Sequence, residues 1–452
     1  MNSSLNWSQT LRSYLDKRLL WVFMLGCASG FPWVLIGSNM SGWLTDAGLS
    51  RSAIGFFGSV FTVYAINFLW APLVDRVKLP VLHAWLGQRR SWIFLCQSIV
   101  LLCTFGIAQF DPANSLVFTS LLALCIATAS STQDIAIDAY RIDSFANAES
   151  HRLPQASAMA VIGWWTGYSL PGYLAFINAD SIGWNGVYLG MCFIVALLML
   201  FTVLVKEPLS NREALQQQAE LRHAEYLGTR SPLLAWLTVT VAEPFLDFFR
   251  RNGVRVAITL LLFVFLFKIG EAFLGRMSIT FYREVGFSNE QIGHYSKLIG
   301  WGATVVFTII GSAFNVRFGI IKGLILGGIA MASSNLMFAW IASAGPNEQL
   351  FLATIIVDNF TSAFATVAFV SFLTVLTGQA FSATQYALLA SLGNLGRTTL
   401  ASFSGNLADY LESWPLFFIL TAVMVIPSLI MLLSLKGYFT KILAHNASSK
   451  QS

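Results

Sequence analysis

The chain has 452 residues, of which 56% are hydrophobic and only 11% are charged. Soluble domains carry about 25% charged residues, so this composition excludes a soluble globular protein and predicts a helical protein that crosses a membrane many times. The net charge of +5 does not indicate nucleic-acid binding, because the basic residues stand between apolar segments. The five cysteines form no C-x-x-C or Cys/His motif, which argues against a metal site or a disulfide framework.

Twelve segments are apolar over the roughly 20 residues that a membrane-spanning helix needs. The first resembles the apolar part of a signal peptide, but it runs on to Ile36 and no polar mature domain follows it. We therefore predict an uncleaved first helix. The twelve predicted helices are residues 19–43, 53–74, 91–110, 115–140, 155–179, 184–205, 254–282, 290–314, 319–342, 348–378, 384–408 and 414–435.

The segment 206–253 separates the sixth helix from the seventh. It starts polar and glutamine-rich and becomes amphipathic over 232–251, where its apolar run is too short to span. We predict a cytoplasmic linker whose second part lies on the membrane surface. The predicted divisions are an N-terminal six-helix half (1–205), the linker (206–253), a C-terminal six-helix half (254–435) and a cytoplasmic tail (436–452).

Lysine and arginine are concentrated in alternate connections between the predicted helices. Basic loops stay on the cytoplasmic side, so this pattern places both termini in the cytoplasm and requires an even number of helices. The opposite connections hold only Arg51 and Arg283. The basic side holds Arg12, Lys17, Arg18, Arg76, Lys78, Arg89, Arg90, Arg141, Arg152, Arg317, Lys322, Lys436, Lys441 and Lys450, together with the basic residues of 206–253.

A faint internal repeat relates the two halves. Gln155 stands eight residues before Gly163, and Gln385 stands eight residues before Gly393. Two six-helix repeats joined by a cytoplasmic linker predict an all-α transporter of the major facilitator type, with its site at the repeat interface near mid-membrane. The pairs Gly26/Gly30 and Gly163/Gly167 have the spacing typical of close helix packing.

The fourth predicted helix ends in hydroxyls, an amide and two carboxylates, Asp134 and Asp138. An ionised carboxylate in lipid costs about 2.5–3.5 kcal/mol, so such groups face a bundle interior or a watery cavity. The two residues are four apart and share one helix face. In a low-dielectric cavity a carboxylate can load and release a proton near neutral pH, which makes both candidates for proton coupling. The alternative for Asp138 is a structural pair with Arg141, three residues on.

The seventh predicted helix carries Lys268 and Glu271, three residues apart. One interpretation is a self-neutralising pair that makes insertion tolerable. The other is that Lys268 pairs with Asp134 across the halves in one state and is released on protonation, as coupling requires. His294 and Asp358 are interpreted as ordinary interfacial residues near the outer mouths.

Three further features indicate substrate binding. Arg397 stands on a glycine-rich segment, where its planar guanidinium suits either a substrate carboxylate or a structural bridge. Trp164, Trp165 and Tyr168 offer flat faces for sugar rings, although interfacial tryptophan is common and successive tryptophans cannot share one face. Gln133 suits sugar hydroxyls.

Six segments together resemble the bacterial muropeptide permease (AmpG) family. They are LGCASGFP (25–32), WAPLVDR (70–76), QRRSW (88–92), STQDIAIDAY (131–140), KIGEAF (268–273) and ATQYALL (383–389). The resemblance covers residues from about 19 to 435 and implies an inner-membrane importer of anhydro-sugar muropeptides for peptidoglycan recycling, driven by protons. Glu271 departs from the aspartate expected in the family pattern, which keeps the carboxylate but changes its reach.

We therefore predict a proton-coupled secondary transporter, with Asp134 first and Glu271 second as proton sites. Lys268 and Arg397 are the candidates for substrate carboxylates. The predicted gate residues are Asp75, Arg76, Arg89, Arg90 and Arg141. The expected partners are the small-molecule cargo, protons and membrane lipid. We expect a monomer without cofactor or metal, since no Walker-type, G-x-S-x-G or H-E-x-x-H motif occurs.

The alternatives are a siderophore or acyl-coenzyme A importer on the same scaffold, and a membrane-embedded enzyme that acts on lipid-linked sugars. A metal-dependent enzyme of that kind would need further acidic ligands near Asp134 and Asp138, and the sequence does not supply them. A sensor without transport activity has no appended domain to support it.

Overall fold

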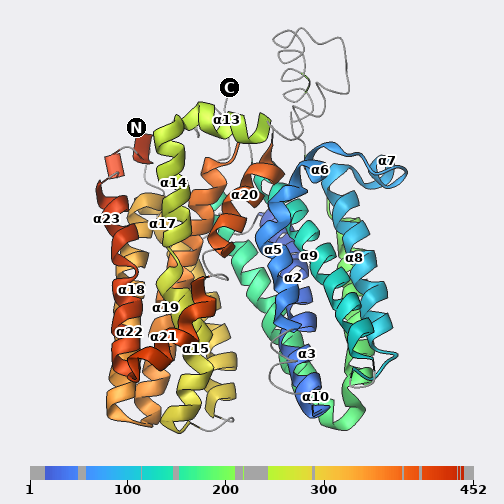
Figure 1. The fold of residues 1–452 in the computed structure, drawn as a ribbon. Helices are drawn as coiled ribbons and strands as arrows, with labels where there is room; N and C mark the ends of the chain where they lie inside the picture. The colour runs from blue at the N-terminus through green and yellow to red at the C-terminus, as the bar shows by residue number, and fades with distance from the viewer. Residues whose placement is uncertain are drawn as a thin grey trace.

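The computed structural model describes residues 16–48, 57–112, 115–145, 152–208, 217, 243–287, 291–378, 381–395, 400–434, 436–437 and 439–441. All regular elements in these ranges are helices (Figure 1). Nine helices in this part of the chain are long and apolar enough to cross a membrane. The other three predicted spans, 53–74, 155–179 and 384–408, correspond to helical stretches at 58–76, at 153–182 and, in the described parts of the last, at 382–395 and 401–411. These stretches pack alongside the nine.

The N-terminal half follows the predicted order closely. Its elements are α2 (Lys17–Val34), η2 (Leu35–Asn39), α3 (Met40–Asp46), η3 (Gly58–Thr62), α5 (Val63–Ile66), η4 (Asn67–Leu69), α6 (Ala71–Arg76), α7 (Leu82–Leu86), α8 (Gln88–Ile107), α9 (Leu116–Ser144) and α10 (Leu153–Leu204). The long α10 contains both the fifth and the sixth predicted helices. It breaks at Gly183, whose φ of 69° suits glycine, between the predicted segments 155–179 and 184–205.

The C-terminal half begins with a helix that crosses the end of the bundle. Its elements are α13 (Glu243–Asn252), α14 (Val254–Leu266), α15 (Ile269–Val285), η6 (Ile292–Ile299), α17 (Gly300–Phe318), α18 (Ile320–Ala344), α19 (Glu348–Leu376), α20 (Ser382–Leu395), η8 (Ala401–Phe403), α21 (Ser404–Leu411), α22 (Trp414–Val423) and α23 (Ile426–Ser434). In Figure 1, α13 lies crosswise at the end where α6 and α7 also lie.

Several of the membrane-spanning helices are interrupted along their length. The stretch 58–76 alternates between 3₁₀-helix and α-helix. A two-residue break at Phe267 and Lys268 separates α14 from α15. Irregular backbone at membrane depth is tolerated where it is buried in protein or lines a cavity. The interruption at Lys268 therefore falls at one of the predicted site residues.

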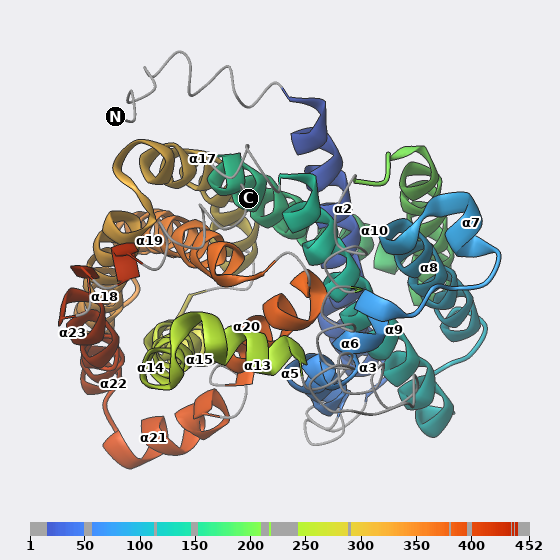
Figure 2. The same cartoon turned by 90° about the horizontal axis from the view of Figure 1, so that it is seen from above.

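Seen from above, the helices of the two halves form two groups, with α20 at the junction (Figure 2). One apolar core lies wholly within the N-terminal half and another wholly within the C-terminal half. Smaller clusters join the halves, such as the one in which Ala383 and Ala387 of α20 pack with Ile135 and Tyr140 of α9. Each half is therefore a packed unit, and α20 is a main contact between them.

Glycines bring α2 and α10 into close contact, which confirms that these glycines serve helix packing. A Cβ atom at Gly30 would lie 2.0 Å from the carbonyl oxygen of Trp164, and one at Gly167 would lie 2.1 Å from that of Cys27. Only glycine fits such an approach. This packing fixes the position of Trp164 beside α2.

Candidate functional site

A buried cluster of charges closes the junction of the halves at the α13 end. Arg89 bonds Asp75 through Nη2 and Asp143 through Nε, both at 3.0 Å, and these three side chains are at most 3% exposed. Ser382 of α20 accepts a hydrogen bond from Arg89 at 2.9 Å and donates one to Asp143 at 3.0 Å. Arg89, one of the predicted gate residues, therefore contacts the opposite half directly.

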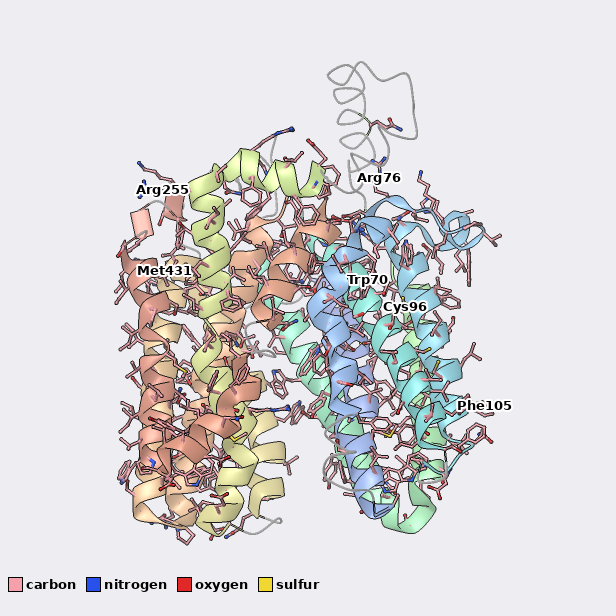
Figure 3. The ribbon with its side chains drawn as sticks, viewed as in Figure 1. Trp70, Arg76, Cys96, Phe105, Arg255 and Met431 are labelled. Atoms are coloured by element: carbon pink, nitrogen blue, oxygen red, sulfur yellow. The ribbon has the colours of Figure 1, made fainter. Side chains whose placement is uncertain are left out.

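The remaining predicted gate residues lie at the same end. Arg90 donates to the carbonyl oxygens of Thr202 and Val203, where α10 ends. Figure 3 shows Arg76 at this end of the N-terminal half and Arg255 at this end of the C-terminal half. Arg141 bonds Asp138 at 2.8 Å, and its guanidinium lies 5.0 Å from the ring centre of Tyr386 in α20.

Asp16 connects the N-terminus of α2 with that of α10, at the same end of the N-terminal half. Its carboxylate caps α2 and pairs with Arg18 at 2.7 Å and with Arg152 at 2.5 Å. The hydrogen bond from Arg18 holds the pKa of the Asp16 carboxyl below its ordinary value. The α13 end therefore carries many ion pairs.

Asp134 lies deeper in the N-terminal half. Ser29 of α2 donates a hydrogen bond to its Oδ1 at 2.6 Å. Its neighbour Gln133 is only 1% exposed and donates to the carbonyl oxygen of Ala28 at 2.7 Å. Both side chains thus point to α2, and the amide of Gln133 is already engaged by the α2 backbone.

The predicted aromatic residues of α10 belong to a larger group. Trp164 stacks on Tyr168 with ring centres 5.5 Å apart, and it meets Trp165 edge-on at 5.2 Å. Trp33 of α2 lies 5.8 Å from Trp164 and 4.5 Å from Tyr64. Its indole Nε1 is buried without a hydrogen-bond partner in the described part of the chain. We call Trp33, Tyr64, Trp164 and Tyr168 the aromatic arc.

Sequence reasoning missed Trp33 and Tyr64. A single aromatic residue in an apolar helix carries no signal of its own. The usable signal was the spacing of Ser29 and Trp33, which puts the partner of Asp134 and the indole on one face of α2.

The C-terminal half holds the second polar centre. Lys268 Nζ lies 2.8 Å from Glu271 Oε2 and donates to Thr366 Oγ1 at 2.6 Å. Ser362 donates to Glu271 Oε1 at 2.6 Å. In this structure, therefore, Lys268 pairs with Glu271 while Asp134 accepts from Ser29. Arg397 lies outside the described residues.

Asp358 is not placed as the sequence interpretation expected. It accepts a hydrogen bond from Ser334 of α18 at 3.3 Å, and it stands one helical turn from Ser362 on α19. It therefore borders the second polar centre. His294 is exposed.

The side-chain hydrogen bonds that join the halves, among the described residues, involve α20 or the start of α10. Besides the gate contacts, Ser391 of α20 donates to Asn67, and Ser312 of α17 donates to the carbonyl oxygen of Pro154. These contacts close the end of the molecule that carries α13. The polar centres around Asp134 and Lys268 lie beyond that closure.

Comparison with known proteins agrees with this architecture. A model described as "Major Facilitator Superfamily" matches residues 22–282. The chain is 34% identical over 426 residues to a putative transporter, AmpG 4, of Rickettsia felis, which covers 93% of this chain and 97% of that protein. It is 30% identical over 429 residues to the anhydromuropeptide permease of Escherichia coli K12, covering 94% of this chain and 81% of that protein.

Solved structures support the same fold. The proton:xylose symporter XylE superposes with a TM-score of 0.69 at 16% identity, covering 93% of this chain and 95% of that one. The human organic anion transporter MFSD10 gives a TM-score of 0.62 at 16% identity, with 92% and 98% covered. The chain is therefore a multi-pass membrane transporter, and it belongs to the AmpG family within the Major Facilitator Superfamily.

Proposed function

We propose that this protein imports anhydro-muropeptides, which are sugar-linked peptides released during cell-wall turnover, across the bacterial inner membrane. The observation that carries this proposal is its 30% identity to the E. coli anhydromuropeptide permease over 94% of the chain. The proposed role is peptidoglycan recycling, with protons driving uptake. The two polar centres, one in each half, fit a cargo that carries both sugars and carboxylates.

The aromatic arc is the proposed sugar subsite. Pyranose rings present C–H faces that pack on flat aromatic surfaces, and their hydroxyls need hydrogen-bond partners. Trp33, Trp164 and Tyr168 are only half-buried, so parts of their rings remain accessible. The buried Nε1 of Trp33 supplies a donor for a sugar oxygen. Trp165 lies at the edge of this arc.

The peptide part of the cargo carries carboxylates, and Lys268 is the proposed cation for them. Its side chain is 15% exposed and is held by Glu271 and Thr366. A cargo carboxylate would compete with Glu271 for Lys268. Arg397 is the second proposed cation, because a guanidinium binds a carboxylate through two parallel bonds.

Asp134 is the proposed first proton site, with Glu271 second and Asp138 third. Asp134 reaches the interior of the N-terminal half, where Ser29 stabilises its acceptor oxygen at 2.6 Å. Asp138 is already neutralised by Arg141 at 2.8 Å, which favours a structural role for it. Protonation of Asp134 would weaken the hydrogen bond that it accepts from Ser29 of α2. Loss of this contact would shift the equilibrium between the conformations of the transporter.

The closed end with α13 is the proposed cytoplasmic end. The basic residues of the alternate connections support this orientation, as do Arg76 and Arg255 in Figure 3. Cargo would then enter from the outer side and leave when the contacts of Asp75, Arg89 and Ser382 separate. Reporter fusions at Ser210 and Lys450 test the orientation, and a periplasmic signal at either position would contradict it.

The function is tested by uptake of labelled anhydro-muropeptide into proteoliposomes with an imposed pH gradient. We expect accumulation that requires the gradient and is not reduced by an excess of siderophore or acyl-coenzyme A. Competition by either compound would favour that cargo instead. Product formed by purified protein without a gradient would favour an enzyme. Size measurement of the purified protein checks the proposed monomer.

A further inference from the structure

The first turn of α20 is held on two sides. Toward the N-terminal half, Ser382 accepts a hydrogen bond from Arg89 at 2.9 Å. Thr384 donates to Asp75 at 2.8 Å on the same side. Gln385, the next residue, is 1% exposed and bonds α13, which lies beside α20 in Figure 2. The gate contacts and the contacts of α13 therefore meet within one helical turn.

The amide of Gln385 uses all of its hydrogen-bonding capacity on the α13 side. Its Nε2 donates to the carbonyl oxygen of Pro244 at 2.9 Å and to Asp247 Oδ2 at 2.8 Å. Its Oε1 accepts from Arg251 Nη2 and from the backbone N–H of Gly378, both at 2.7 Å. An amide has two donor hydrogens and two acceptor lone pairs, so every one of them is engaged. Because Nε2 meets only acceptors and Oε1 only donors, the partners determine the orientation of the amide.

Arg251 and Gly378 extend these contacts to the end of α19. Arg251 also donates to the carbonyl oxygen of Leu376, the last residue of α19, at 3.3 Å, and it pairs with Asp247 at 3.0 Å. Gly378 belongs to the connection that follows α19. Gln385 therefore joins α20 both to α13 and to this connection, and it restricts the motion of the first turn of α20.

The gate needs this turn in one conformation. Asp75 accepts from the backbone N–H groups of Ala383 and Thr384 as well as from the Thr384 hydroxyl, so its bonds require the helical arrangement of the turn. A segment that is already ordered loses less conformational freedom when it binds, and the contact is tighter for that reason. Gln385 supplies this order from α13.

We propose that Gln385 is a positioning residue of the gate, which holds the first turn of α20 against α13 in the conformation that Asp75 binds. In the described part of the chain, the hydrogen bonds of the Gln385 side chain go to none of the gate residues, so it acts through α20. The strength of the closed end then depends on α13. This inference rests on the proposed function in one respect, namely that the contacts of Asp75 form the gate, and it does not depend on the cargo.

The test measures how readily the closed end opens. A reporter, Ser391→Cys, is placed in a background without the five native cysteines. Ser391 is 2% exposed and stands about 14 Å of helix rise beyond Ser382. A membrane-impermeant thiol reagent is added at the α13 side of membrane vesicles without cargo. The rate at which the reporter reacts measures opening.

Gln385→Leu removes all four hydrogen bonds of the amide and leaves a side chain of similar size. We expect the reporter to react about tenfold faster, as loss of one net hydrogen bond at the gate predicts. Gln97→Leu is the matched control, because Gln97 is 2% exposed on α8 and has no hydrogen-bond partner among the described residues. It should leave the rate unchanged. An unchanged rate in Gln385→Leu, with a lower melting temperature, would indicate a purely structural role and overturn the inference.

An exchange of groups between Gln385 and Asp247 tests the contact with α13 itself. Gln385→Glu puts a second carboxylate beside Asp247, and the repulsion between them should raise the labelling rate. Adding Asp247→Asn supplies an amide that can donate to the new carboxylate, while Arg251 and Gly378 still donate to it. The double variant should therefore react more slowly than Gln385→Glu alone. If it does not, α13 does not position α20 and the inference fails.

Combination with Asp75→Asn shows whether Gln385 acts through the gate contact. Asp75→Asn weakens the group that the ordered turn binds, so Gln385→Leu should then accelerate labelling by much less than tenfold. Independent, multiplicative effects of the two changes would overturn the inference even if transport is confirmed. If Asp75→Asn alone leaves the rate unchanged, the proposed gate fails and the inference fails with it. If the protein does not take up muropeptide while the two effects are coupled, the proposed cargo fails and this inference stands.

Discussion

Asp75 and Thr384 belong to opposite halves of the protein and are joined by two hydrogen bonds. The backbone N–H and the hydroxyl of Thr384 each donate to Asp75 Oδ2 at 2.8 Å. The first turn of α20 has unpaired N–H groups and a partial positive charge, so a carboxylate there is stabilising. Arg89 holds the other oxygen of Asp75 at 3.0 Å, so both oxygens of the carboxylate are engaged.

Asp75→Asn should loosen the closed end. Asparagine is uncharged, so the hydrogen bonds that this side chain accepts from Arg89 and Thr384 become weaker. Each hydrogen bond to a charged group contributes about 1.5–3 kcal/mol to stability. A cysteine at Ser391, which is buried beyond the gate, should then react about tenfold faster or more with a membrane-impermeant thiol reagent added at the α13 side.

Asp46→Asn is the matched control for Asp75→Asn. Asp46 accepts a hydrogen bond from Trp184 and makes no gate contact in the described structure. Equal labelling rates in wild type and Asp75→Asn would show that Asp75 does not hold the gate.

Asp134→Asn should abolish accumulation driven by a pH gradient while substrate exchange survives. Asparagine can still accept the bond from Ser29, but it cannot carry a proton. Asp138→Asn should be milder, since its principal contact is the local pair with Arg141. Both variants are measured for gradient-driven uptake and for exchange at matched expression. Gradient-driven accumulation by Asp134→Asn would move the proton role to Glu271.

Gly167→Ala should destabilise the N-terminal half. The added Cβ would lie 2.1 Å from the carbonyl oxygen of Cys27, and overpacking typically costs about 1–3 kcal/mol. Gly190 also belongs to α10, and a Cβ added there would have no atom within 4 Å. Gly190→Ala should therefore leave the stability unchanged or raise it slightly. Melting of the purified proteins in detergent compares the two. Equal melting temperatures would mean that α2 and α10 do not need this close approach.

Arg397→Lys should weaken uptake of a cargo that carries peptide carboxylates. Lysine keeps the charge but loses the planar fork that binds a carboxylate through two bonds. A muropeptide analogue without those carboxylates should be transported equally by both proteins. Equal loss for both cargoes would indicate a structural bridge.

The membrane-spanning segments could be predicted because lipid enforces a simple pattern. A helix of about 20 apolar residues satisfies its own backbone, so hydropathy alone locates α9 and α19 within a few residues of their ends. The glycine spacing likewise predicted close helix packing at Gly30 and Gly167, while the structure supplied the finding that α2 and α10 are each other's partners. The placement of 206–253 and 436–452 in the cytoplasm stays a prediction, since most of those residues lie outside the described ranges.

The site was less predictable because its geometry depends on neighbouring helices. Spacing alone could pair Asp138 with Arg141 and Lys268 with Glu271, and the structure contains both pairs. Whether Gln133 turns to the cavity or to the α2 backbone is decided by packing. Asp358 stands one helical turn from Ser362, which bonds Glu271. The sequence did not indicate this neighbourhood, because Ser362 is an ordinary uncharged helix residue.

The contacts of α13 show where the chain could be divided. Arg251 donates to Gln385 at 2.7 Å and to the carbonyl oxygen of Leu376, while Gln385 donates to Asp247 at 2.8 Å. These bonds make α13 part of the C-terminal half, so a polypeptide that begins just before Glu243 would retain them. The halves meet through α20, the start of α10 and the buried gate, none of which needs a continuous backbone. Two separately made polypeptides, co-expressed in one membrane, should therefore assemble into a working transporter.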